Sequence, residues 1–373
     1  MDFVTLSALQ IAFFTPGAIT AIVAIGLVLA FKFGFLRFLP CYERHLNSVQ
    51  STHLHPTPRL GGVAIMAGFI ALATVGLPNT AVLVTVSIAP IFIVGLLEDL
   101  GVPMSPRRRL ASVAVSCLIE IVLRGVWMQR YDLLGFDELV AQAAFGIPVT
   151  LLLVGGISHA FNLIDGLNGL ASGVAALAAC ALGTIAMFAG DVTLATTGYM
   201  FGTVIAGFMP VNFPFGKLFL GDAGAYCVGY ILAWIGIALV MRNPDVSAWS
   251  VFLVFLWPVA ETFWAIFRRK IKGLSVTAAD RMHMHHVVMR GLEIAVLGPN
   301  RRTIANPLAT MLLLPLAAAP VTAGVLLWRE PLAGFAASVG FLMIYILTYV
   351  AAVRVLPKLR TKVTPRNPVV SVP

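Results

Sequence analysis

The chain has 373 residues, of which 59% are hydrophobic and only 11% are charged, and its mean hydropathy is +0.94. Soluble proteins carry roughly 25% charged residues. The composition therefore excludes an ordinary soluble domain and predicts a protein embedded in a bilayer. A net charge of +9 would suggest a nucleic-acid partner in a soluble protein. Here the basic residues stand in loops between apolar segments, where they set topology and meet anionic headgroups or phosphates, so no nucleic-acid partner is expected.

Apolar segments long enough to cross a bilayer recur along the whole chain. A spanning helix needs about 20 apolar residues, and eleven segments qualify, although Glu120 and Arg124 in the fourth leave a count of ten open. Their approximate limits are 11–33, 60–77, 80–97, 110–126, 143–161, 170–189, 194–212, 223–241, 249–267, 307–328 and 333–353. The expected fold is all-α, a polytopic integral-membrane domain that covers residues 1–373.

The distribution of Lys and Arg selects an orientation in the membrane. Eleven spans place the termini on opposite sides, and with the N-terminus outside, 21 of the 25 basic residues are cytoplasmic. The positive-inside rule therefore predicts an outside N-terminus and a cytoplasmic C-terminus. A secondary transporter for an anionic solute would show internal repeats and mid-membrane carboxylates. The chain shows no such repeat, and its acidic residues gather at one face.

Paired and isolated acids occur in unusual sequences on the predicted cytoplasmic side. Glu98 and Asp99 end the third span, where two acids can bind a divalent cation or one can act as a base. The alternative there is a solvated helix end. Asn162 and Asp165 stand in the stretch NLIDGLNGL between two spans. Glycines admit a ligand to the backbone, and the amide and carboxylate can read a nucleobase or hold a metal. A simple turn between helices is the alternative.

Three further stretches add charge to the same side. Asp222, in KLFLGDAG after Lys217, opens a span at a position that suits a hard cation with phosphate oxygens. A plain N-cap aspartate is the alternative. The stretch DRMHMHH at 280–286 supplies imidazoles for phosphate or metal contacts, or else is a basic interfacial loop. In HLHPTPRLGG, Arg59 offers a planar fork for phosphate.

All five stretches fall on one membrane face, in a topology chosen from Lys and Arg alone. Their agreement predicts one shared metal-and-phosphate site. We expect it to be built from the cytoplasmic loops at 45–62, 98–109, 162–169, 213–224 and 268–306.

In their order along residues 45–291, these motifs resemble the polyprenyl-phosphate N-acetylhexosamine-1-phosphate transferases, the membrane family of WecA and MraY type. The resemblance implies transfer of N-acetylhexosamine 1-phosphate, by default GlcNAc-1-phosphate, from a UDP-sugar to undecaprenyl phosphate. UMP is released, and Mg²⁺ or Mn²⁺ is required. The HxHH loop is similar to the WecA-like branch, which begins surface polysaccharides such as O-antigen at the bacterial cytoplasmic membrane. A homodimer is possible.

The resemblance also implies roles for individual residues. Asp222 would hold the metal with Asn162 or Glu98, and Asp99 would engage or deprotonate the lipid phosphate. The catalytic set is thus Asp99, Glu98 and Asp222. The implied substrate-binding residues are Asn162, Asp165, Lys217, Arg281, His283, His285, His286, Arg59 and Arg109.

Three departures from the family pattern leave alternatives open. Glu98 stands where the family usually has Asp, Asn168 where it usually has a third acid, and His55 where Lys is frequent. The first two motivate the alternative of a catalytically idle relative that binds lipid or nucleotide sugar. The chemistry is also open between direct attack by the lipid phosphate and a covalent phospho-Asp99 or phospho-Glu98 intermediate.

Overall fold

The computed structural model describes residues 3–35, 57–75, 79–275, 280, 282–298 and 301–363, and within them the chain is helical with no strand. A short π-helical turn, Glu293–Leu297, follows α13. The helices are α1 (Phe3–Lys32), α3 (Gly61–Thr74), α4 (Asn79–Ser87), α5 (Ala89–Asp99), α6 (Pro106–Arg124), α7 (Phe136–Ala141), α8 (Ala143–Ile164), α9 (Leu170–Phe188), α10 (Val192–Asn212), α11 (Gly221–Arg242), α12 (Ala248–Ile271), α13 (Met284–Leu292), α14 (Arg302–Leu326) and α15 (Pro331–Val363).

The predicted all-α membrane fold is confirmed. Eight of the described helices are long and apolar enough to cross a membrane. They are α1, α8, α9, α10, α11, α12, α14 and α15. The second predicted span corresponds to the shorter α3, and the fourth to α6, which carries Glu120 and Arg124. The number of crossings and their orientation stay predictions.

The third predicted span is broken into α4 and α5 around Ile88. Pro90 lies in the first turn of α5, where a missing N–H is tolerated because that turn has no intrahelical partners. One N–H of this turn, that of Ile91, donates instead to Ser116 Oγ of α6 at 3.2 Å. The break therefore leaves that buried backbone donor satisfied and fixes α5 against α6.

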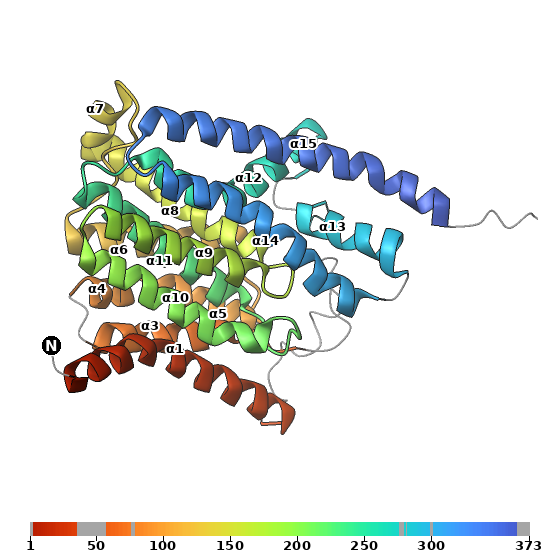
Figure 1. Cartoon of the computed structure of the whole chain (residues 1–373), viewed down its shortest axis with the longest axis horizontal. Coiled ribbons are helices and arrows are strands. Elements are labelled where there is room, and N and C mark those ends of the chain that lie inside the picture. The colour runs from red at the N-terminus through yellow and green to blue at the C-terminus, as the bar shows by residue number, and fades with distance from the viewer. Residues whose placement is uncertain are drawn as a thin grey trace, which may run out of the picture.

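The long helices lie side by side, with α1 on one flank of the bundle and α15 on the other (Figure 1). At the centre, α11 contacts α3, α5 and α8, and 18 of its 22 residues are buried. Figure 1 also places α7 at one end of the bundle and α13 at the opposite end. The end that carries α13 is the one where the predicted site stretches meet.

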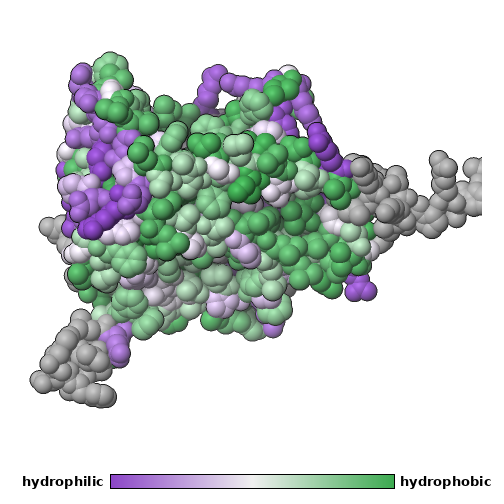
Figure 2. All heavy atoms as spheres, turned by 45° about the horizontal axis from the view of Figure 1, so that its top comes forward, coloured by the Kyte–Doolittle hydropathy of each residue, from purple (hydrophilic) through white to green (hydrophobic). Residues whose placement is uncertain are grey.

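The outer surface of the bundle is largely apolar between its two ends (Figure 2). Large apolar side chains such as Ile22, Val122 and Leu152 are exposed there. A soluble monomer rarely exposes such continuous apolar area, whereas a lipid-facing surface requires it. Hydrophilic residues concentrate toward the ends in the same view.

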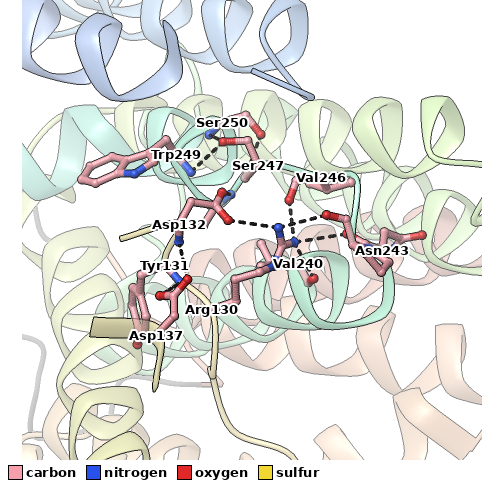
Figure 3. Close-up of polar contacts among 12 residues, drawn as sticks. Arg130, Tyr131, Asp132, Asp137, Val240, Asn243, Val246, Ser247, Trp249 and Ser250 are labelled. Carbon is pink, nitrogen blue, oxygen red and sulfur yellow. Dashed lines mark hydrogen bonds and ion pairs between the residues drawn. The ribbon is translucent and has the colours of Figure 1, made fainter. Parts of the chain in front are cut away.

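At the α7 end, Arg130 clamps the connection between α11 and α12 (Figure 3). Its guanidinium donates to Asp132 Oδ1 at 3.0 Å and to four backbone carbonyls. One is that of Val240 in the last turn of α11, and the others are those of Asn243, Pro244 and Val246 in the connection. Asp132, held at a positive φ of 55°, accepts from the Ala248 N–H at the start of α12 at 2.7 Å. The planar fork of Arg satisfies carbonyls that the end of α11 leaves unpaired.

Candidate active site

The stretch before α3 pairs with the stretch before α11 through backbone hydrogen bonds. Phe219 N–H donates to the Pro58 carbonyl at 3.0 Å, and Gly61 N–H donates back to the Phe219 carbonyl at 2.9 Å. Gly62 N–H adds a bond to the Leu220 carbonyl at 2.9 Å. Two motifs separated by about 160 residues therefore form one backbone unit, which places Arg59 beside the N-terminus of α11.

Small residues let three helices converge at this point. A Cβ on Gly62 of α3 would lie 2.5 Å from the Gly224 nitrogen, and one on Gly95 of α5 would lie 2.6 Å from the Ala223 Cα. Gly221 has a φ of +76°, a conformation that L side chains rarely adopt. The glycines of the RLGG, GLLED and FLGDAG sequences are thus required for close packing of α3 and α5 on α11.

Asp99 caps the N-terminus of α11. Its two carboxylate oxygens accept from the N–H groups of Asp222 and Ala223, each at 2.9 Å, and the residue is only 1% exposed. The Nε of Arg59 lies 3.2 Å from Asp99 Oδ1. The carboxylate satisfies two of the N–H groups that begin α11 and complements the positive end of its dipole.

Asp222 is the point where three motifs meet. Its Oδ1 accepts from Arg59 Nη2 at 2.7 Å and from Asn162 Nδ2 at 2.9 Å. Its carboxyl group also lies within hydrogen-bonding reach of the Glu98 carboxyl. Successive helical residues point about 100° apart, so Asp99 turns into the α11 interface while Glu98 turns toward the Asp222 side chain.

Arg59 and Asp165 lie outside the long helices, and burial and the neighbouring charges shift their pKa values. Burial lowers the pKa of Arg59, but the carboxylates of Asp222 and Asp99 outweigh it, and the pKa lies above its ordinary value. Burial raises the pKa of Asp165 to about 7, against the lowering effect of Arg59. Asp165 lies at the end of α8, one helical turn after Asn162. The turn therefore adds a carboxyl group that takes up a proton near neutral pH.

The histidine stretch, the DRMHMHH sequence at 280–286, lies against the NLIDGLNGL turn. His283, His285 and His286 are all buried, and their rings contact one another. A Cβ on Gly166 would lie 2.3 Å from His285 Nε2, so the ring occupies the space that this glycine leaves open. The structure thus brings the 280–286 stretch next to Asp165, as one shared site requires.

Burial keeps two of these histidines neutral. It lowers the pKa of His286 to about 4, with the neighbouring His283 and Arg290 acting in the same direction. It also lowers the pKa of His285 well below the ordinary value, and His286 is the next cause. At neutral pH the two rings therefore offer hydrogen bonds rather than positive charge.

The other predicted site residues lie at the margin of the cluster or outside the residues that the structure describes. Arg109 Nη1 is 3.5 Å from Glu98 Oε1. Lys217 is exposed, with its ammonium 5.3 Å from the centre of the Phe215 ring. Arg281 and the part of the first loop at 45–56, with His55, lie outside the described residues.

Asn168, where the family pattern has an acid, is buried and holds the turn in place. Its Nδ2 donates to the Pro214 carbonyl at 2.9 Å, and its carbonyl accepts from Thr310 of α14 at 2.7 Å. Its own N–H donates to Asn306 Oδ1 at 2.8 Å. The side chain therefore joins the NLIDGLNGL turn to the 213–218 loop, and the backbone of Asn168 joins the turn to α14.

Two site residues did not stand out in the sequence. Tyr226 lies beside the Arg109 guanidinium, and His159 packs edge-on against Tyr226 with ring centres 5.0 Å apart. Among the described residues, His159 Nε2 is buried without a hydrogen-bond partner. Helical spacing was the available signal, because His159 precedes Asn162 by three residues and Tyr226 follows Asp222 by four.

The cluster suits a divalent cation that also binds phosphate. Glu98 Oε2 is a buried acceptor with no partner among the described residues, and it belongs to a carboxyl group that faces Asp222. Two adjacent carboxyl groups can share a proton or bind a divalent cation between them. Within the same residues, no three His, Cys, Asp or Glu side chains are arranged to hold a metal alone. Mg²⁺ commonly binds one or two carboxylates and completes its shell with water and substrate phosphate.

Comparison with known proteins identifies relatives of this chain. Residues 81–240 match the model of glycosyl transferase family 4. The resemblance that the motifs indicated is confirmed: the chain is related to the WecA/MraY-type polyprenyl-phosphate sugar-phosphate transferases. The matched residues include α5, α8 and the start of α11, which carry Glu98, Asn162 and Asp222.

Three relatives illustrate the relationship. A probable undecaprenyl-phosphate N-acetylglucosaminyl 1-phosphate transferase of Bacillus subtilis is 28% identical over 65% of this chain and 68% of its own length. A decaprenyl-phosphate N-acetylglucosaminephosphotransferase of Mycolicibacterium smegmatis is 29% identical over 77% of this chain and 75% of its own. An undecaprenyl-phosphate alpha-N-acetylglucosaminyl 1-phosphate transferase of Escherichia coli O157:H7 is 26% identical over 62% of this chain and 65% of its own length.

Proposed function

We propose that this protein transfers N-acetylglucosamine 1-phosphate from UDP-N-acetylglucosamine to undecaprenyl phosphate at the cytoplasmic membrane face. The observation that carries the proposal is the convergence of Arg59, Asn162 and Glu98 on the Asp222 carboxylate. The relatives, whose names give a polyprenyl phosphate and an N-acetylglucosamine phosphate, support the substrate classes. The product would be the first lipid-linked sugar of a cell-surface polysaccharide such as O-antigen.

The reaction is a phosphoryl transfer. An oxygen of the lipid phosphate forms a bond to the β-phosphorus of the donor, the bond from that phosphorus to the bridging oxygen breaks, and UMP leaves with the electron pair. Such transition states depend on alignment and charge neutralisation. A phosphate monoester with a second pKa near 6 is mostly ionised at neutral pH, so no strong base is required.

The positions of the two paired acids suggest different tasks for them. Asp99 is buried, with both oxygens occupied by α11 N–H groups. We propose that it fixes Asp222 and Arg59 in place, and that Glu98, with Arg109, faces the lipid phosphate. Direct attack fits this division, because Asp99 could be phosphorylated only after its hydrogen bonds to the Asp222 and Ala223 N–H groups were broken. Isotope exchange of UMP into the donor without lipid would contradict direct attack.

Asp222 and Glu98, with Asn162, would hold Mg²⁺ or Mn²⁺. The ion would neutralise charge on the transferring phosphoryl group. Asp165 would contact the nucleotide with Asn162, and the histidine stretch would lie over the diphosphate. The neutral rings of His285 and His286 would donate hydrogen bonds to it, while Arg281 and Lys217 would supply positive charge. A homodimer is compatible with the apolar outer surface and stays a proposal.

The test is UMP release by the purified protein in detergent, with undecaprenyl phosphate, Mg²⁺ and a panel of UDP-N-acetylhexosamines. The proposal expects release that needs lipid and metal, that is highest with UDP-N-acetylglucosamine, and that Asp222→Ala abolishes. Gly156→Ala is the control variant, because a Cβ at that position meets nothing within 4 Å. A folded protein that binds donor but releases no UMP from any member of the panel would instead be the idle relative.

A further inference from the structure

A polar network joins the last helix, α15, to the histidine stretch. Glu261 of α12 is its centre and is only 2% exposed. Its Oε1 accepts from the Met284 N–H at 2.9 Å and lies 3.0 Å from His283 Nδ1. Its Oε2 accepts from the Tyr345 hydroxyl of α15 at 2.6 Å. A carboxylate buried at this depth persists only if its oxygens are satisfied, and Tyr345 satisfies one of them.

A second contact from α15 lies one helical turn further on. The Tyr349 hydroxyl donates to the Met282 carbonyl at 2.8 Å, and Arg268 Nη1 donates to the same oxygen at 2.6 Å. Asp280 accepts from the Met282 N–H at 2.9 Å and pairs with Arg268. Residues 282–284 are therefore held from two sides, by side chains of α12 and of α15.

This anchoring fixes where α13 begins. The helix starts at Met284, whose N–H is bound to Glu261, and His285 and His286 occupy its first turn. His285 in turn fills the space left by Gly166, beside Asp165. A contiguous path of contacts thus runs from Tyr345 through Glu261 and Met284 to the turn between α8 and α9.

We propose that Tyr345 and Tyr349 are positioning residues, through which α15 holds the histidine stretch over the donor side of the site. The kinetic part of this inference rests on the proposed function, and the structural part does not. Tyr345→Phe removes one hydroxyl and keeps the ring that packs on Trp257, with centres 5.3 Å apart. Loss of the bond weakens the hold on residues 283–286 without opening a cavity.

The structural readout is hydrogen exchange of the peptide that covers residues 282–290, in detergent and without substrate. Tyr345→Phe is expected to speed exchange of the Met284 amide by about tenfold, the effect of one hydrogen bond to a charged group. Tyr230→Phe is the matched control, because its buried hydroxyl bonds Ser87 Oγ at 3.0 Å and the Ser116 carbonyl at 2.9 Å, in another part of the bundle. That control is expected to leave this peptide unchanged.

The kinetic readout separates donor from acceptor. Tyr345→Phe is expected to raise the donor KM by about tenfold while the lipid KM stays at the wild-type value, and Tyr349→Phe to act in the same direction. Wild-type exchange and wild-type donor KM in Tyr345→Phe would overturn the inference, as would an equal effect of Tyr230→Phe. If the wild type releases no UMP, the proposed function fails, and the exchange comparison still decides whether α15 positions the stretch.

Discussion

At the scale of single residues, Arg59 joins the two carboxylates on which the site is built. It lies 3.2 Å from Asp99 and 2.7 Å from Asp222, and so connects the group that caps α11 to the group proposed to hold the metal. The flat guanidinium can serve both at once because its donors are fixed in a fork, whereas an ammonium is a point charge.

Arg59→Lys tests this geometry while keeping the positive charge. We expect a fall in the rate of UMP release of about 10- to 100-fold, because one bond between charged groups is lost. The melting temperature should fall only slightly, since Asp99 keeps its bonds to the α11 N–H groups. A lysine variant with wild-type turnover would show that the fork is not required.

The histidine stretch predicts a dependence of stability on pH. The folded state lowers the pKa of His286 to about 4, whereas an unfolded histidine titrates near 6.5. The unfolded chain therefore binds more protons between these values, so stability is full above about pH 6.5 and falls as the pH drops toward 4.

The loss from His286 alone is expected to be of the order of 3 kcal/mol across that window. Melting temperatures at pH 7.5 and pH 4 measure it, and His286→Gln should reduce the difference between the two. An unchanged difference in the glutamine variant would mean that other groups cause the pH dependence.

Sequence patterns identified most of the clustered residues but not how they divide their tasks. Glu98 and Asp99 are adjacent in sequence, and only the packing of α5 on α11 shows that Asp99 turns inward as a cap. The sequence assigned no role to Glu261, which lies within α12. Its role depends on Tyr345, 84 residues away, and no local pattern encodes that contact.

At the scale of helices, glycines bring the motifs together, because the absence of a side chain lets α3 and α5 pack closely on α11. Gly62→Ala should force α3 away from α11, because the new Cβ would lie 2.5 Å from a backbone nitrogen. We expect a loss of about 1–3 kcal/mol in stability and reduced turnover, since Arg59 and Asp222 would separate. The control Gly156→Ala meets no atom within 4 Å and should be neutral or slightly stabilising. Equal melting temperatures for the two variants would contradict this account.

The Arg130 clamp at the opposite end should matter for stability alone. Arg130→Lys cannot reproduce bonds to four carbonyls and to Asp132, so we expect a loss of about 1.5–3 kcal/mol. Thermal unfolding in detergent measures it. The donor KM of the protein that remains folded should equal that of the wild type, and a changed KM would mean that the two ends of the bundle are coupled.

Helix positions could be predicted better than helix continuity. Length and apolarity are local properties, and each predicted span coincides with helical structure. The break between α4 and α5 is accompanied by a hydrogen bond from the Ile91 N–H to Ser116 of another helix. This contact joins separate segments, which apolar periodicity does not report.

For the molecule as a whole, the described site residues gather at the α13 end of a bundle whose sides are apolar. A water-soluble nucleotide sugar and a membrane-bound phosphate can meet at such a place without either leaving its own phase. The cytoplasmic orientation of this end follows from the distribution of Lys and Arg and stays a prediction.

The most direct test of the central claim is the identity of the lipid product. Purified protein with UDP-N-acetylglucosamine, undecaprenyl phosphate and Mg²⁺ should form undecaprenyl diphosphate N-acetylglucosamine, seen by mass spectrometry, with one UMP for each product molecule. Transfer of the sugar without its phosphate would release UDP instead. That result, or the same lipid product from Asp222→Ala at the wild-type rate, would contradict the account.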